Sequence, residues 1–343
     1  MSEVLNTLYV TIERASLHKD HGALVVKADR EEKLRVPLLH LQGVVCFGPA
    51  WVSPELMGAL VEQGAHVAFL DFAGRMVARV EGIPGGNVLL RRAQFRAAES
   101  APASLQLARS MVVGKVYNQR QVLLHAARDS EGERQQALSG AAHKLAQALR
   151  ELEKVPASMD VLRGVEGMAA RNYFEVFQQL IRSDDTALVF NGRSRRPPRD
   201  RINALLSFGY ALLLQDCIAA CCAIGLDPAV GYLHEDRPGR MGLALDLMEE
   251  LRAPVVDRLV LALVNRGQLK AEDIAASEQE GFLLTKEGRK AFIAAHRASH
   301  ADEIQHRFLE RLVTWGEVPH LQALLLARTL RGDLDAYPPF AIK

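Results

Sequence analysis

A short run of glycine and proline, Gly82-Ile83-Pro84-Gly85-Gly86, constrains the fold of this chain more than any other stretch. Such a run sustains neither a helix nor a strand, because glycine is too flexible and proline lacks the amide hydrogen that both structures need. The residue pattern also changes there, from short β-branched runs to long stretches of helical period. The sequence therefore predicts two domains, residues 1–82 and 88–343, joined by a linker at residues 83–87.

The first domain has the pattern of short strands. Ser53-Pro54-Glu55 predicts one helix start, because serine caps the first turn and proline fits its first position. The other apolar runs are rich in β-branched residues and are separated by charged or glycine-containing turns. We expect a small, mostly-β domain, in which the mixture of alternating and continuous apolar runs leaves the sheet topology open. The expected strands are Leu8–Ile12, Ala23–Val26, Leu34–Leu38, Val44–Phe47, His66–Leu70 and Met76–Val80.

Beyond the break almost every stretch has helical period and is rich in alanine, leucine, arginine and glutamine. The sequence predicts a larger all-α domain here, and so an α+β protein. With 343 residues, of which 49% are hydrophobic, the chain can bury a large core. The expected helices are Val88–Ala98, Pro102–Arg128, Arg134–Leu152, Ser158–Ile181, Ile202–Leu226, Pro254–Asn265, Thr285–His296 and Val318–Thr329.

The helix expected at Ile202–Leu226 is almost wholly apolar and long enough to span a membrane. Gln215 and Asp216 lie near its centre, and an aspartate there costs roughly 2.5–3.5 kcal/mol on insertion scales. It is also the only such segment in the sequence. We therefore expect a buried central helix and no membrane span.

Charge and cysteine usage exclude some classes of protein. Forty-two basic and 41 acidic residues give a net charge of +1, so any nucleic-acid surface must be local. The four cysteines form no CxxC pair, and the N-terminus lacks a basic stretch followed by a long apolar core, so a reducing cytoplasm fits best. No nucleotide-binding glycine motif occurs, since Gly114-Lys115 lacks the earlier glycine and the following Ser or Thr. Nucleotide-driven chemistry is not indicated.

The segment Gly231–Arg252 places a histidine, a turn and an acidic helix within 22 residues. Pro238-Gly239 breaks the chain after His234, and helical spacing then resumes. Asp246, Glu249 and Glu250 are related by i,i+3 and i,i+4, so they share a stripe and would repel one another unless a cation lies between them. Carboxylates with one imidazole suit Mg²⁺ or Mn²⁺. A solvated acidic face with an ordinary histidine is the alternative.

Two further groups of residues are candidates for functional roles: an acid on a helix and an arginine-dense loop. Glu166 lies among alanine and aromatic neighbours on a helix, where the plain alternative is a surface carboxylate paired with Arg163 or Arg171. Pro197-Pro198 keeps an arginine-dense loop extended, which suits phosphate backbones, although a solvated or disordered charge run is equally compatible. The arginines of this loop are Arg193, Arg195, Arg196, Arg199 and Arg201.

The last residues, Asp335–Lys343, read DAYPPFAIK and predict an extended segment. Docking on another chain is one interpretation. A frayed terminus is the favoured one, because chain ends are poorly ordered unless they are tied down.

Three motifs carry a family resemblance: EGMAARNYF from Glu166, NALLSFGYALL from Asn203 and GYLHEDRPGRMGLALDLMEELR from Gly231. In this order they resemble the CRISPR-associated spacer-acquisition integrase, the first Cas family, which is also described as a metal-dependent DNA endonuclease. The order of a strand-rich domain before a helical domain is similar too. The resemblance therefore extends over essentially the whole chain.

The resemblance implies a catalytic site. Its metal ligands fall on Glu166, His234 and Glu249, and Asp246 matches another acidic position of the site. Many relatives have Asp where Glu249 stands. The implied ion is Mg²⁺ or Mn²⁺, which would polarise a phosphoryl oxygen. Side chains that could neutralise charge or contact DNA are Arg171, Arg237 and Arg240, with Tyr173 beside Glu166 contacting sugar or base, or simply packed.

The implied reaction is phosphoryl transfer, in which the 3′-OH of a captured DNA fragment attacks a phosphodiester at the edge of the CRISPR repeat. The resemblance also implies a homodimer, here expected through the first domain, and a higher complex with a small ferredoxin-like partner subunit. Its DNA partners would be double-stranded fragments and CRISPR repeat DNA. Two alternatives stay open: a metal-dependent nuclease that only hydrolyses, and a non-catalytic DNA-binding scaffold.

Overall fold

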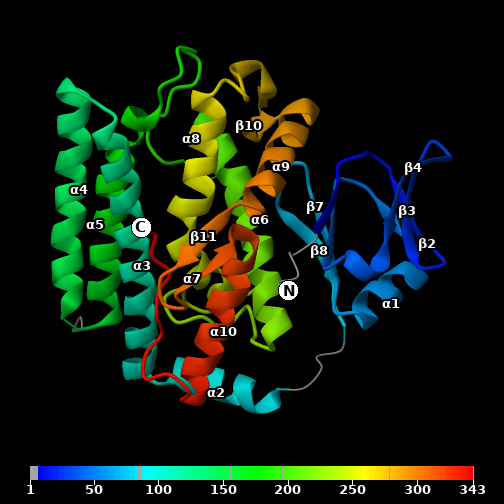
Figure 1. The fold of residues 1–343 in the computed structure, drawn as a ribbon, viewed down its shortest axis with the longest axis horizontal. Coiled ribbons are helices and arrows are strands. Elements are labelled where there is room, and N and C mark those ends of the chain that lie inside the picture. Colours follow the sequence, from blue (N-terminus) through cyan, green and yellow to red (C-terminus); the bar gives the residue numbers. More distant parts are fainter. Residues whose placement is uncertain (1–6, 83–86, 155–156, 195, 278, 343) are drawn as a thin grey trace.

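The computed structural model describes residues 7–82, 87–154, 157–194, 196–277 and 279–342. Figure 1 shows a strand-rich region in blue beside a larger helical region that runs from cyan to red. This order confirms the predicted fold class. The predicted linker lies mostly outside the described residues, so the two-domain division stays a prediction.

The first region contains two four-stranded sheets and one helix. One sheet has the order β1 (Thr7–Val10), β5 (Gly43–Phe47), β7 (His66–Leu70), β8 (Met76–Val80); only the β7–β8 pair is antiparallel. The other has the order β4 (Glu31–Pro37), β3 (Ala23–Ala28), β2 (Ser16–Asp20), β6 (Trp51–Val52). Helix α1 (Pro54–Glu62) begins as predicted, because the Ser53 hydroxyl accepts a hydrogen bond from the Leu56 amide at 3.2 Å.

Strand β5 explains why the apolar runs were continuous rather than alternating, since all five of its residues are buried. Side chains alternate across a strand. Val44 and Cys46 enter a small core with the second sheet and α1, whereas Val45 and Phe47 enter the core of the helical region. The Phe47 ring lies 5.7 Å from the ring of Phe208, centroid to centroid. The two regions therefore share one core across the composition break.

The helical region follows the predicted order of helices, with ends shifted by a few residues. Its helices are α2 (Val88–Glu99), α3 (Ala101–Arg128), α4 (Gly132–Glu153), α5 (Met159–Glu175), α6 (Arg201–Ile224), α7 (Gly242–Leu251), α8 (Arg258–Asn265), α9 (Lys286–His300) and α10 (Val318–Arg331). A π-helical turn, Arg252–Asp257, joins α7 to α8. Short 3₁₀ turns occur in this region at Phe177–Leu180, Ala271–Asp273 and Trp315–Glu317, and in the first region at Leu38–His40.

The helical region is not purely helical, which corrects the all-α expectation in detail. Two antiparallel hairpins interrupt it, β9 (Ile274–Ser277) with β10 (Gly281–Leu284), and β11 (Glu303–His306) with β12 (Arg311–Thr314). Each strand has four residues. Runs this short carry too little periodicity to distinguish a strand from a helix end.

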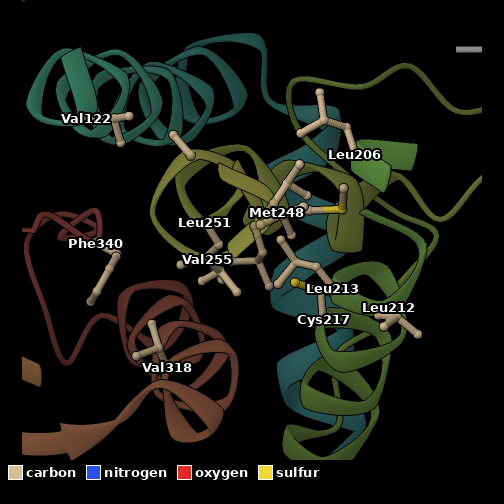
Figure 2. Packing of buried hydrophobic residues seen from close by; sticks show 14 of the residues in the cluster. Val122, Leu206, Leu212, Leu213, Cys217, Met248, Leu251, Val255, Val318 and Phe340 are labelled. Carbon is tan, nitrogen blue, oxygen red and sulfur yellow. The ribbon is translucent and has the colours of Figure 1, made fainter. Parts of the chain in front are cut away.

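Helix α6 is the apolar helix whose sequence could also suit a membrane span. By length and composition it qualifies, but 61% of its most apolar window is buried inside the protein. Figure 2 shows Leu206, Leu213 and Cys217 of α6 in the same cluster as Met248 and Leu251 of α7. The expected role as a buried central helix agrees with this packing.

The last described residues are docked rather than frayed, which corrects that interpretation. Figure 1 shows them in red, running from the end of α10 along α3. Tyr337, Phe340 and Ile342 are 1–3% exposed. The Phe340 amide donates to Glu250 at 2.7 Å, and the Ile342 amide donates to Asn118 at 3.0 Å. The segment satisfies two buried polar side chains of the helical region.

Glu250 therefore does not share a site with Asp246 and Glu249. Its carboxylate also accepts hydrogen bonds from the Tyr337 hydroxyl and, at 3.0 Å, from Gln322. Burial raises the pKa of Glu250 to about 7, although these hydrogen bonds oppose the shift. The expected stripe of three acids is wrong in this respect, because the segment 337–342 turns Glu250 into a structural residue.

Candidate active site

A buried lysine lies between two of the predicted metal ligands. Lys115 on α3 is 5% exposed. Its ammonium makes a close ion pair with Glu166 of α5 and lies 2.6 Å from Glu249 of α7. The preceding residue, Gly114, packs closely on α7 and on the C-terminal segment, since a Cβ there would lie 2.9 Å from Pro339 Cβ and 3.0 Å from Glu250. The repulsion expected between acids is thus relieved by a cation that belongs to the protein.

Asp246 holds the loop that carries His234. Its carboxylate accepts hydrogen bonds from the amides of Tyr232, at 2.6 Å, and of Leu233 and His234, both at 3.0 Å. The His234 ring contributes a fourth contact, from Nδ1 at 2.6 Å. Gly231 is required here, since a Cβ would lie 2.7 Å from Asp246 Oδ2. Asp246 is fully buried and both of its oxygens hold the His234 loop, which suits a residue that positions His234; its assignment to the catalytic group stays a prediction.

Glu249 is the buried acid that faces His234. Its Oε1 lies 3.9 Å from His234 Nε2 and 2.8 Å from Arg252 Nη1. Burial by itself would raise the pKa of Glu249, but the positive charges of Arg252 and Lys115 outweigh it and lower the pKa to about 2. Glu249 is therefore ionised at any physiological pH.

The three predicted ligands fit a divalent cation. Glu249 Oε2 is buried and makes no hydrogen bond of good geometry, despite its distance of 2.6 Å from Lys115. Glu166 and His234 are partly exposed, with 24% and 17% of their side-chain surface accessible. Glu249 lies 3.9 Å from His234 and shares Lys115 with Glu166. Two carboxylates, one with an unpartnered oxygen, and an imidazole are donors that suit a hard divalent ion.

The site opens on a groove of about 1510 Å³. Lys115, His234 and Arg252 line it and contact the acids of the site, and Phe72 and Arg75 of the β7–β8 turn also form part of its wall. Asp257 and Glu280 are the acidic residues among its lining. Basic side chains outnumber them, which gives the groove the charge expected of a phosphate-binding surface. The arginines that line it are Arg75, Arg193, Arg196, Arg237, Arg240 and Arg252.

The β7–β8 turn anchors the first region to this groove. Asp71 accepts hydrogen bonds from the amides of Ala73, at 2.9 Å, and Arg75, at 2.8 Å. Gly74 has φ +84° and packs so closely on α6 that a Cβ would lie 3.0 Å from that of Ala211. Arg75 makes an ion pair with Glu280, next to β10. The turn is therefore held from both sides of the groove.

The chain matches known proteins over nearly its whole length. A family model described as CRISPR associated protein Cas1 matches residues 8–298. The chain is 52% identical to "CRISPR-associated endonuclease Cas1 2" of Rhodospirillum rubrum and 45% identical to "CRISPR-associated endonuclease Cas1 1" of Chlorobaculum tepidum, with 99% of each chain covered in both comparisons. The chain belongs to the Cas1 family. Membership confirms the function predicted from the three motifs, that of a CRISPR-associated endonuclease and integrase.

Solved structures share the fold of this Cas1-family chain. A casposase bound to an integration product has a TM-score of 0.82 at 22% identity, with 97% of this chain and 93% of that chain covered. A Cas1 protein from Thermotoga maritima has a TM-score of 0.81 at 22% identity, with 98% and 100% covered. At these identities the likeness concerns the fold alone.

The predicted DNA contacts divide into groove residues and residues that hold the fold. Arg196, Arg237 and Arg240 line the groove. Arg193 also lines it but donates to Asn203 at 2.6 Å and lies over the ring of Tyr210. These four remain candidates for phosphate contact in the Cas1-family site.

The other predicted contacts have different surroundings. Arg201 donates to the Ala271 carbonyl at 3.1 Å and lies over the Phe282 ring, so it fixes the start of α6. Arg171 is exposed and paired with Glu175, and Arg199 is exposed on its loop; neither lines the groove. Arg195 lies outside the described residues.

Tyr173 is not available to DNA, which corrects the expected sugar or base contact. Its side chain is fully buried, and its hydroxyl donates to Asp257 at 3.0 Å. Tyr210 donates to the same carboxylate at 2.6 Å. Burial raises the pKa of Asp257 to about 6, although both hydrogen bonds oppose the shift. Tyr173 is a packed aromatic that satisfies a buried acid.

Sequence reasoning missed three residues that shape the site of this Cas1-family chain. Lys115 had been considered only as part of an absent nucleotide motif. Its signal was a lysine on the apolar stripe of a long helix, beside Gly114. Arg252 makes an ion pair with Glu249. Arg163 donates to the Leu233 carbonyl at 3.0 Å, which fixes the loop beside His234. Helical spacing had marked Arg163 only as a possible partner of Glu166, and no local pattern marked Arg252.

Proposed function

We propose that the groove joins the 3′-OH of a DNA fragment to a phosphodiester of CRISPR repeat DNA. The observation that supports this proposal best is an arginine-lined groove whose lining includes His234 and Lys115. Lys115 pairs with Glu166 and Glu249, and Glu249 lies 3.9 Å from His234. A site with carboxylates alone would attract cations and repel DNA. Here the arginines offset that repulsion along the path a phosphate backbone would take.

We propose that Glu166, His234 and Glu249 hold Mg²⁺ or Mn²⁺. The bound ion would supply a positive charge that stabilises negative charge on the phosphoryl oxygens. Lys115 lies among the same carboxylates and lines the groove, so its ammonium can balance their charge or pair with a phosphate oxygen. Arg252 keeps Glu249 ionised and thus ready to act as a ligand.

The proposed reaction balances without another reactant. A bond forms between the attacking 3′-oxygen and phosphorus, and the bond from phosphorus to the departing 3′-oxygen breaks. The attacking hydroxyl loses one proton, and the departing oxygen gains one. Asp246 fixes the His234 ring through Nδ1, which directs Nε2 towards Glu249. The residues of the chain thus orient the groups and hold charge, while the DNA supplies the nucleophile.

Hydrolysis is the second candidate, because water can replace the 3′-OH at the same site. A joining assay with a labelled fragment and repeat DNA distinguishes the two. We expect a branched product that contains both DNAs, formed only with added Mg²⁺ or Mn²⁺ and absent after chelation. Cut repeat DNA without any branched product would reject the integration proposal and favour hydrolysis. Binding without either product would favour a scaffold.

The groove arginines predict a salt-dependent, sequence-independent contact with DNA. We expect alanine at both Arg196 and Arg237 to weaken duplex binding about equally for unrelated sequences. The slope of log affinity against log salt should fall by up to roughly two, because each phosphate contact contributes about one unit. Arg331 is the matched control, since it is exposed on α10, pairs with Asp333 and lies outside the groove lining. An unchanged slope would mean that neither arginine contacts phosphate and that both are solvated.

We also propose that the protein forms a homodimer through its first region. In the cytoplasm, this dimer would form a higher complex with a small ferredoxin-like subunit. Large apolar side chains of the first region that are at least 41% exposed support an interface there: Leu34, Leu39, Trp51 and Val77. We expect light scattering to give a dimer at micromolar concentration and aspartate at Leu39 and Trp51 to weaken it. Val161→Asp, on exposed α5, is the control. A stable wild-type monomer would contradict the proposal.

A further inference from the structure

A second group of metal-ligand side chains lies away from the groove. Asp216 of α6 faces His296 and His300 of α9, and one ligand atom from each lies within 4.8 Å of the others. His296 Nε2 is 3.6 Å and His300 Nε2 is 3.7 Å from Asp216 Oδ2. The Tyr9 ring of β1 stands edge-on to His296, with centroids 6.1 Å apart. The cluster thus lies where the first region meets the helical region.

The cluster is polar, buried and unsatisfied. His296 has no exposed surface, and neither of its ring nitrogens makes a hydrogen bond. Asp216 Oδ2 has no hydrogen-bond partner either. Distances of 3.6 and 3.7 Å are too long for hydrogen bonds between these atoms. Leaving buried polar atoms unpaired destabilises a fold, so this arrangement calls for an additional partner between the three side chains.

The three side chains are also metal ligands by chemical type. A carboxylate and two neutral imidazoles each donate an electron pair to a metal, and here one ligand atom of each lies within 4.8 Å of the other two.

We propose that Asp216, His296 and His300 hold a transition-metal ion of the Zn²⁺ class. His296 and His300 are separated by four residues, so they share one face of α9 and can ligate one ion together. With bonds of about 2.0–2.1 Å in a tetrahedral site, two ligand atoms lie roughly 3.3 Å apart. The observed 3.6 and 3.7 Å need little adjustment.

The donor set differs from that of the groove. Two imidazoles and one carboxylate favour Zn²⁺ or a similar ion, whereas the groove offers two carboxylates and one imidazole. The ion would bridge α6 to α9 beneath β1, and its role is structural. The inference stands independently of DNA joining, because it involves none of the residues of the groove site.

Cobalt binding tests the proposal in the full chain. The metal-stripped protein is titrated with Co²⁺, whose visible absorption reports a nitrogen- and oxygen-ligated site. His234→Ala serves as the background, because it impairs the groove site. We expect one equivalent of Co²⁺ to give a visible band in this background, and the affinity to fall at least about tenfold with the further change His300→Ala or Asp216→Asn. His143→Ala is the matched control, since His143 is exposed on α4.

A second measurement guards against variants that fail to fold. Zn²⁺ should raise the unfolding temperature in the His234→Ala background by several degrees, because a ligand of the native state stabilises it. The near-isosteric Asp216→Asn should retain the circular dichroism of the parent and lose this increase. Absence of both the band and the increase in the parent, or their full retention in Asp216→Asn, would overturn the proposal and leave a water-bridged polar cluster.

Discussion

Alanine at Glu166 or at His234 is expected to lower the rate of strand joining by a factor on the order of 10³. Each change removes one proposed ligand of the metal ion that would contact the reacting phosphate. Both side chains are partly exposed, so neither change opens a cavity in the core. Circular dichroism and duplex affinity should stay close to those of the parent. Initial rates with repeat DNA and saturating Mg²⁺ provide the measurement.

Two further variants make this expectation specific. Asp246→Asn keeps the shape of the side chain but changes its hydrogen bonds to the His234 loop, and we expect a loss of about 10–100-fold, typical of a residue that orients a ligand. His143→Ala, on the exposed face of α4, should be fully active. Near-native joining by both Glu166→Ala and His234→Ala would rule out the proposed site.

Removal of residues 336–343 is expected to destabilise the fold strongly. Tyr337, Phe340 and Ile342 are almost fully buried, and each such side chain contributes roughly 1.5–3 kcal/mol, which gives about 5 kcal/mol or more for the three. Glu250 and Asn118 would also lose hydrogen-bond partners in the interior. Thermal unfolding followed by circular dichroism should show a clear fall in the midpoint temperature.

Single changes test the same segment without truncation. Tyr337→Phe removes only the hydroxyl that contacts Glu250 and Gln322, and we expect a loss of ~1–2 kcal/mol. Asp335→Ala, on the exposed side of the preceding turn, should be neutral. If the truncated chain melts like the full chain, the docked segment contributes nothing to stability and the frayed terminus was the better interpretation.

Local patterns in the sequence predicted much of this architecture. Ser53 and Pro54 marked the start of α1, and the apolar periods marked the long helices to within a few residues. The family motifs also selected Glu166, His234 and Glu249 from many carboxylates and histidines; Lys115 links the two glutamates, and Glu249 lies 3.9 Å from His234, while their role as ligands stays a prediction. Each of these signals lay within a single stretch of the chain, such as Gly231–Arg252, which holds both His234 and Glu249.

Long-range partners could not be predicted in the same way. Helical spacing put Asp246, Glu249 and Glu250 on one stripe, but the structure gives them three different roles. The difference arises from partners far away in the sequence, such as Lys115 for Glu249 and Phe340 for Glu250. Tyr173 was misjudged for the same reason, since Asp257 lies 84 residues away. Periodicity gives the direction of a side chain and not the group that it meets.

The β7–β8 turn links two equilibria, the binding of a nucleic acid in the groove and the separation of the two regions. Phe72 and Arg75 belong to the first region but form part of the groove wall, and Arg75 reaches Glu280 on the opposite region. A nucleic acid seated against this wall contacts both regions at once, so its binding free energy also opposes their separation. By thermodynamic linkage, a change that loosens the shared core at Phe47 and Phe208 weakens such a ligand once it populates molecules whose regions have separated. The composition break at residues 82–86 therefore marks a change in sequence pattern, while contacts such as Phe47–Phe208 and Arg75–Glu280 connect the regions on either side of it.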